Sequence, residues 1–185
     1  MDQELYWIIY CDSNKYRTFD VYDHQKYFDI VRDLYSGVPL IDSWTKLSVQ
    51  LYADDKGKEQ NKPYSDFMHL SEMTINCKAK QLLDEMISRN TEYLPIDTPI
   101  GDYWLLNIYP VDCINLENSI VEYFSDGGVL NIEVFDFYYE KIQGTHIFIT
   151  PELRSRAVFV TQTFKQYYSD NKLSGLLFCP VPLAK

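Results

Sequence analysis

Glycine and histidine are scarce in this sequence, and their spacing excludes two common kinds of site. The seven glycines form neither G-x-G-x-x-G nor G-x-x-x-x-G-K-[ST], the loops whose backbone amides approach phosphate, and Gly127-Gly128 indicates a turn. The three histidines, His24, His69 and His146, lack the spacing of a zinc site. We therefore expect no cofactor and no metal.

Cysteine is also sparse, with four residues and no C-x-x-C pair. Cys11, Cys77, Cys113 and Cys179 are therefore predicted to be buried free thiols. A Cys-His nucleophile can still be assembled by the fold from Cys113 and either His69 or His146, because such groups need only spatial proximity. No local motif supports that alternative.

Long apolar runs are absent. No stretch approaches the roughly 20 apolar residues of a membrane span. The first residues carry acid at Asp2 and Glu4 and lack the basic region and small-residue cleavage site of a secretory leader. These features predict a cytoplasmic protein.

Positive charge is in deficit, with 17 Lys and Arg against 27 Asp and Glu, a formal net charge of −10. Such a field repels nucleic acid and anionic membrane surfaces, so we expect neither as a partner. It attracts a basic protein, with faster association at low salt. The simpler interpretation, that the charge only keeps the chain soluble, stays open.

Apolar and aromatic residues are abundant. The 185 residues are 46% hydrophobic and include 16 Tyr and 10 Phe, which excludes intrinsic disorder. A chain of this length is predicted to form a single domain over residues 1–185, with a core that needs no metal or disulfide.

Hydrophobic periodicity predicts an α+β fold with a mixed, largely antiparallel sheet and two or three packing helices. Alternation or apolar runs predict strands at 5–11, 47–52, 92–96, 103–109 and 175–179, with a polar loop at 54–63. Helical spacing predicts a short helix near 30–34 and a longer one over 79–87, capped by Asn76 and stopped at Asn90.

Two further predictions concern the C-terminal third. The β-rich runs 129–138 and 145–150 flank Gln143-Gly144 in a hairpin-like arrangement. Residues 157–160 form a short apolar run, and Val160, Phe164, Tyr167 and Tyr168 share one face of a helix that Asn171 closes.

Carboxylates are numerous enough that acid–base catalysis, as in glycoside hydrolysis, is not excluded by composition. Asp112, between Val111 and Cys113 at a strand end, is the most noticeable of them. A side chain that caps the next turn is the simpler role for it.

The order of several short motifs resembles immunity protein family eleven of the bacterial polymorphic toxin systems. The motifs are PYSDF (63–67), EYLPI (92–96), YWLLNI (103–108), VDCI (111–114), KIQGTHIF (141–148) and KLSGLLFCPV (172–181), and the likeness spans about residues 37–181. The V-D-x-x-D element expected in the family has Asn115 at its last position. The resemblance implies a cytoplasmic antidote that neutralises a cognate toxin, and it brings no catalytic residues.

The resemblance and the acidity together predict a non-enzymatic protein that binds a cognate, basic protein toxin and occludes it stoichiometrically. The candidate contact residues are Asp54, Asp55 and Glu59 in the polar loop, and Asp136, Tyr138, Tyr139 and Glu140 near the expected hairpin. Two alternatives stay open, a hydrolase that reverses toxin damage and a scaffold without a defensive role. The sequence does not indicate the oligomeric state.

Overall fold

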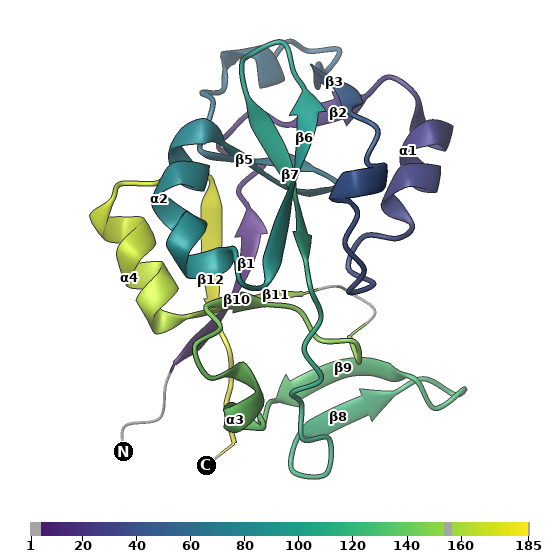
Figure 1. Cartoon of the computed structure of the whole chain (residues 1–185), viewed down its shortest axis with the longest axis vertical. Helices are drawn as coiled ribbons and strands as arrows, with labels where there is room; N and C mark the ends of the chain where they lie inside the picture. The colour runs from purple at the N-terminus through teal and green to yellow at the C-terminus, as the bar shows by residue number, and fades with distance from the viewer. Residues whose placement is uncertain (1–4, 154–156, 185) are drawn as a thin grey trace.

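The computed structural model describes residues 5–153 and 157–184, and their elements confirm the α+β class (Figure 1). The described helices are α1 (His24–Val31), α2 (Cys77–Ile87), the single turn α3 (Tyr139–Ile142) and α4 (Gln162–Asp170). The strands are β1 (Tyr6–Cys11), β2 (Phe19–Val21), β3 (Leu47–Leu51), β4 (Phe67–Leu70), β5 (Glu72–Asn76), β6 (Thr91–Asp97), β7 (Tyr103–Ile108), β8 (Ile120–Tyr123), β9 (Val129–Val134), β10 (Ile147–Phe148), β11 (Val158–Thr161) and β12 (Leu176–Pro180).

A four-stranded antiparallel sheet, in the order β10-β11-β1-β12, separates two hydrophobic cores. Side chains of a strand alternate between its two faces, so β1 directs Ile9 into one core and Tyr6 into the other. All four residues of β11 are buried, because both faces of this strand are covered. That double burial explains the uninterrupted apolar run in the sequence.

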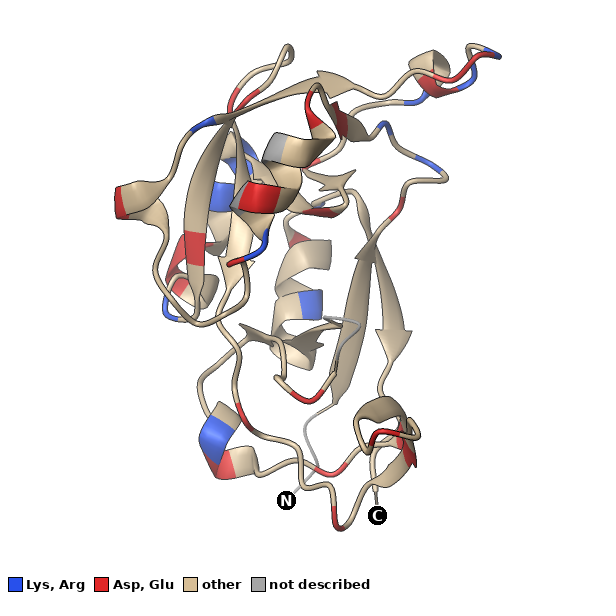
Figure 2. Ribbon diagram, turned by 90° about the vertical axis from the view of Figure 1, so that its right-hand side faces the viewer, with Lys and Arg blue, Asp and Glu red and all other residues tan. Residues whose placement is uncertain are grey.

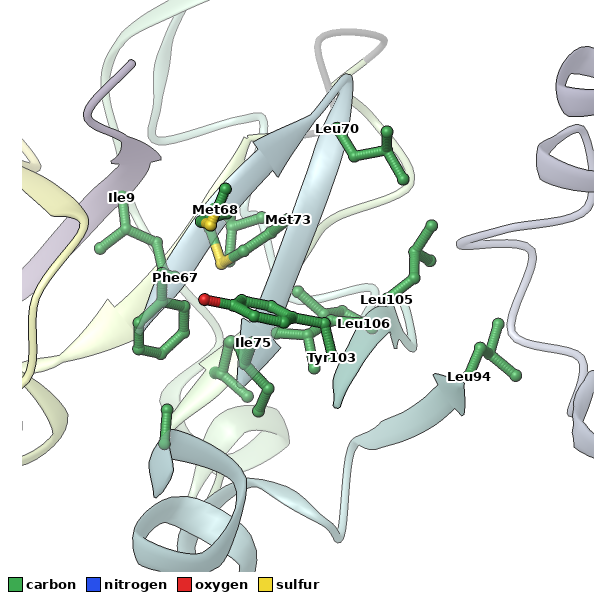
Figure 3. Packing of buried hydrophobic residues seen from close by; sticks show 14 of the residues in the cluster. Ile9, Phe67, Met68, Leu70, Met73, Ile75, Leu94, Tyr103, Leu105 and Leu106 are labelled. Atoms are coloured by element: carbon green, nitrogen blue, oxygen red, sulfur yellow. The ribbon is translucent and has the colours of Figure 1, made fainter. Parts of the chain in front are cut away.

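The larger core lies between this sheet, a six-stranded sheet and two helices. The six strands run β2-β3-β6-β7-β5-β4, and only the β3–β6 pair is parallel. Its two edge strands, β2 and β4, approach each other, so the sheet is nearly closed. Phe67, Ile75 and Leu105 converge in this core (Figure 3), and α2 and α4 add Leu83 and Phe164.

The smaller core is aromatic and lies on the other face of the four-stranded sheet. We call it the aromatic core and define it by Tyr6, Phe135, Phe137, Phe148 and Phe159, all buried. The Phe137 ring lies 5.3 to 6.0 Å, centroid to centroid, from the other four rings. The hairpin of β8 and β9, together with α3, packs against this core at the lower end of the molecule in Figure 1.

The two longer helices begin as their capping residues predict. The Asn76 side chain accepts a hydrogen bond from the Ala79 backbone, and α2 ends at Ile87, three residues before the predicted stop. In α4 the Thr161 hydroxyl accepts from the Phe164 backbone, and Asn171 is the C-cap as predicted. Val160 belongs to β11 and not to α4, because the helix begins only after the Thr161 cap.

The prediction that residues 129–138 and 145–150 form a hairpin-like pair is wrong. β9 pairs with β8, a strand that the sequence patterns did not predict. Gly127-Gly128 lies in the turn between the two strands, as predicted. Residues 147–148 pair instead with β11. The α3 turn separates the two runs, so Gln143-Gly144 does not join paired strands.

The four cysteines are free thiols, but their predicted burial is only partly right. Cys113 is buried, Cys11 is half-buried, and Cys77 and Cys179 are exposed. Cys77 begins α2 beside its cap, and Cys179 lies on β12, an edge strand. Among the described residues, no helix combines the length and the apolar character needed to cross a bilayer.

Candidate functional site

The β8–β9 hairpin is the most exposed apolar feature of the lower end. Within the described chain its two strands form a sheet of their own. One face buries Val129 and Ile132 against the aromatic core. Ile120, Tyr123 and Leu130 of the same two strands lie in solvent, with 54%, 53% and 51% of their surface exposed.

The negative charge of the chain is concentrated in the segment that contains this hairpin. Residues 90–140 hold ten of the 27 acidic residues and none of the 17 Lys and Arg. The whole formal net charge of −10 therefore resides there, and the charges of the remaining residues cancel. The strands β8 and β9 carry Glu122 and Glu133 and no Lys or Arg.

Most acids near the hairpin point into solvent. Between residues 112 and 140 the exposed ones are Asp112, Glu117, Glu122, Asp126, Glu133 and Glu140. The Asp112 carboxylate lies 3.2 Å from the Lys141 ammonium. The lower end therefore presents an acidic surface with exposed apolar groups, a combination typical of protein–protein interfaces.

Asp112 is part of a small carboxylate pair. A hydrogen bond from Glu152, together with the Lys141 charge, lowers the pKa of Asp112. Burial, followed by the neighbouring Asp112, raises the pKa of Glu152. One carboxyl group is thus shifted toward the ionised form and the other toward the neutral form, an arrangement that stabilises a shared proton.

The structure places the second group of predicted contact residues beside the hairpin, in different surroundings. The Asp136 carboxylate accepts hydrogen bonds from Asn115 at 2.9 Å and Asn118 at 3.1 Å, so it fixes the loop before β8. Tyr139 is half-buried against Tyr6. The other two residues of this group are exposed: Tyr138 lies beside the Lys141 ammonium, and Glu140 lies in the first turn of α3.

The first predicted group lies in the polar loop between β3 and β4, at the opposite end of the molecule (Figures 1 and 2). Glu59 forms an ion pair with Lys62, and both side chains are mostly buried. The Asp54 carboxylate accepts a hydrogen bond from the Glu59 backbone. Of the three acids, Asp55 is exposed. The fold does not bring the two predicted groups together.

Two adjoining cavities open beside β1 and β4, with volumes of about 330 and 400 Å³. Both are lined by Ser13, His69 and Ser71, and the first also by Cys11 and Glu72. Burial raises the pKa of the Cys11 thiol to about 12 and lowers that of His69. A thiol with such a pKa stays protonated at neutral pH, so Cys11 is not activated as a nucleophile.

The fold does not assemble the Cys-His pair considered from the sequence. Cys113 is fully buried in the aromatic-core cluster, where burial and the charges of Glu152 and Asp112 raise its pKa to about 12. His146 instead shares a hydrogen bond of 2.9 Å with the Thr161 hydroxyl. His69 lines the cavities beside β4. Within the described residues, no group of three or more His, Cys, Asp or Glu is arranged to hold a metal ion.

Comparison with known families decides the assignment. Residues 24–182 match the model of the immunity protein family (Imm11). The chain belongs to the Imm11 family. The match begins earlier than the resemblance found in the sequence; it includes the hairpin and most of both cores, but not the core residues of β1 and β2. No curated protein matches the chain.

Membership of the Imm11 family indicates a defensive immunity role for this chain and suggests that the role is not catalytic. The family membership also makes the acidic lower end a candidate binding surface, which its geometry alone does not establish. Sequence patterns missed the hairpin as a candidate site because its outward positions mix apolar and acidic residues without regular alternation. The turn signal Gly127-Gly128 and the predicted β-rich run from residue 129 indicated only the turn and β9.

Proposed function

We propose that this Imm11 protein neutralises a cognate protein toxin by binding it stoichiometrically in the cytoplasm and covering its active site. One observation carries the proposal: the entire net charge lies in residues 90–140, and the six exposed acids between residues 112 and 140 lie near exposed apolar side chains of the hairpin. A partner surface that complements these acids is basic. Enzymes that act on anionic substrates, such as nucleases, have basic active sites.

Occlusion of this kind requires a sufficiently large interface and complementary charge. It does not require the immunity protein to turn over a substrate. A stable interface buries about 800 Å² on each partner and depends on a few well-packed anchors, which are often aromatic. Exposed acids around such anchors accelerate encounter with a basic partner and disfavour neutral or acidic ones. The protonated Cys11 thiol in the cavity beside β1 agrees with a role without covalent catalysis.

The test is co-expression with the product of the gene immediately upstream of the one that encodes this chain. We expect that product to be toxic alone and harmless with the immunity protein, and the two to co-purify at a fixed ratio. Association measured at several salt concentrations is expected to slow as salt rises. Neutralisation without a complex would instead indicate an enzymatic mechanism, and a harmless neighbour that does not bind would contradict the proposal.

A further inference from the structure

We propose that the β8–β9 hairpin is the element by which this chain docks, inserting its exposed apolar side chains into a basic, apolar-lined depression on the toxin. The inference rests on the proposed function, since it assumes that a toxin is bound. It goes further by naming the element that binds and the chemistry that it requires of the partner.

Exposure is the first argument. Ile120, Tyr123 and Leu130 are each more than half exposed, and Phe124 beside them is 39% exposed. None of the four belongs to the hydrophobic cluster around the aromatic core, whereas Val129 and Ile132 of the same hairpin are buried in it. Apolar side chains gathered on a projecting hairpin lose their contact with water only when a partner covers them.

Charge identifies the kind of partner. Glu122 and Glu133 are exposed on the same two strands, and neither β8 nor β9 contains a Lys or Arg. Elsewhere, the Tyr64 ring, 51% exposed, has the Arg17 guanidinium 5.7 Å from its centroid. The hairpin thus combines exposed apolar groups with charge of a single sign. A basic surface with an apolar depression complements both.

The base of the hairpin is held in place. Asp136, directly after β9, accepts hydrogen bonds from Asn115 and Asn118, and its backbone N–H donates to the Ser119 hydroxyl. These bonds join the two ends of the hairpin to each other, and Val129 and Ile132 anchor it on the aromatic core. A binding element that is already ordered loses little conformational entropy on association.

The test uses the full chain and the polypeptide encoded immediately upstream as the probe. One variant, Tyr123→Ala with Leu130→Ala, removes exposed apolar groups, and another, Glu122→Lys with Glu133→Lys, reverses exposed charges. Matched controls are Tyr22→Ala, at a tyrosine 67% exposed before α1, and Glu85→Lys on the exposed face of α2. We expect at least a tenfold loss of affinity from the first variant and at least a tenfold slower association at low salt from the second. The controls are expected to stay within about twofold of wild type.

Hydrogen exchange on the unmodified complex gives a second measurement that does not depend on how variants fold. We expect residues 120–133 to gain protection when the probe is bound, with little change in the polar loop at 54–63. Wild-type binding with unchanged hairpin variants, and no protection of 120–133, would overturn the hairpin proposal and leave the proposed function standing. Absence of wild-type binding would overturn both.

Discussion

The side-chain amide of Asn115 donates a hydrogen bond to the carboxylate of Asp136 at 2.9 Å, joining the loop before β8 to the residues after β9. The resemblance to the immunity family leads one to expect Asp at position 115. In this chain the position needs a donor, because a carboxylate there would face the carboxylate of Asp136. The Asn at position 115, which departs from the family pattern, is thus matched to Asp136, 21 residues away in the sequence.

Asn115→Asp is expected to destabilise the protein by roughly 1–3 kcal/mol at neutral pH, since it replaces a hydrogen bond by repulsion between two carboxylates. The loss should shrink as pH falls and one carboxyl group becomes protonated. Urea denaturation of wild type and variant at pH 7 and pH 4 measures both effects. The exposed Asn14→Asp serves as the control, and an equal loss in the control would count against this assignment.

Gly175→Ala is expected to cost at least about 2–3 kcal/mol and to prevent accumulation of folded protein. Gly175 has φ of +105°, and an added Cβ would lie 2.1 Å from the Phe67 carbonyl oxygen, which is backbone and has no room to move. Gly127→Ala is the comparison, because Gly127 also has positive φ, at +82°, but has no atom within 4 Å of the added Cβ. Soluble yield and the denaturation midpoint of the two variants are the measurements. They separate the effect of the close contact between Cβ and the Phe67 carbonyl from the effect of positive φ alone.

Asp66→Ala is expected to destabilise the chain by about 2–4 kcal/mol, because it removes an acceptor from several donors in a buried setting. The carboxylate accepts hydrogen bonds from the Ser174 backbone and hydroxyl, from Asn76 and from Lys78. The control is Lys78→Ala, which removes an ammonium whose side chain is 51% exposed and should cost less than about 1 kcal/mol. Comparable losses for the two variants in thermal denaturation would contradict a central role for Asp66.

Glu152→Gln is expected to stabilise the protein relative to wild type increasingly as pH rises from 4 to 7. Burial raises the folded-state pKa of Glu152 above its unfolded value, so its favourable contribution exists below the unfolded pKa and is lost as pH rises through the folded one. Glutamine stays neutral throughout and can still donate to Asp112. Melting temperatures of the two proteins across this pH range test the sign. The exposed Glu117→Gln should show no such trend, and a gain at low pH for Glu152→Gln would contradict the assignment.

Patterns that depend on burial were readable from the sequence. β1, β3, β7 and β12 lie within one or two residues of the predicted strands, and α2 begins at its predicted cap. The β4–β5 hairpin was not predicted, because Ser71 makes its turn with φ of +59° where a glycine would normally mark one. β8 was missed because an exposed strand has no apolar periodicity to detect.

The candidate site was less predictable than the fold. Acidity indicated a basic partner, but the two predicted groups of contact residues lie at opposite ends of the molecule, and sequence distance gives no warning of that. Asp136 and Glu59 have internal hydrogen-bond or ion-pair partners, which composition cannot reveal. The charge asymmetry of residues 90–140 is present in the sequence, yet it acquires meaning only when the hairpin brings apolar groups beside it.

β1 lies between β11 and β12, so the beginning of the chain is paired on both sides with its last strands. The sheet that divides the two cores therefore cannot close until the ribosome has translated β12. The folded protein should therefore lag behind the start of its synthesis, and a chain truncated before residue 176 should not complete this sheet. A cell that relies on it has to hold a finished supply before an attack begins.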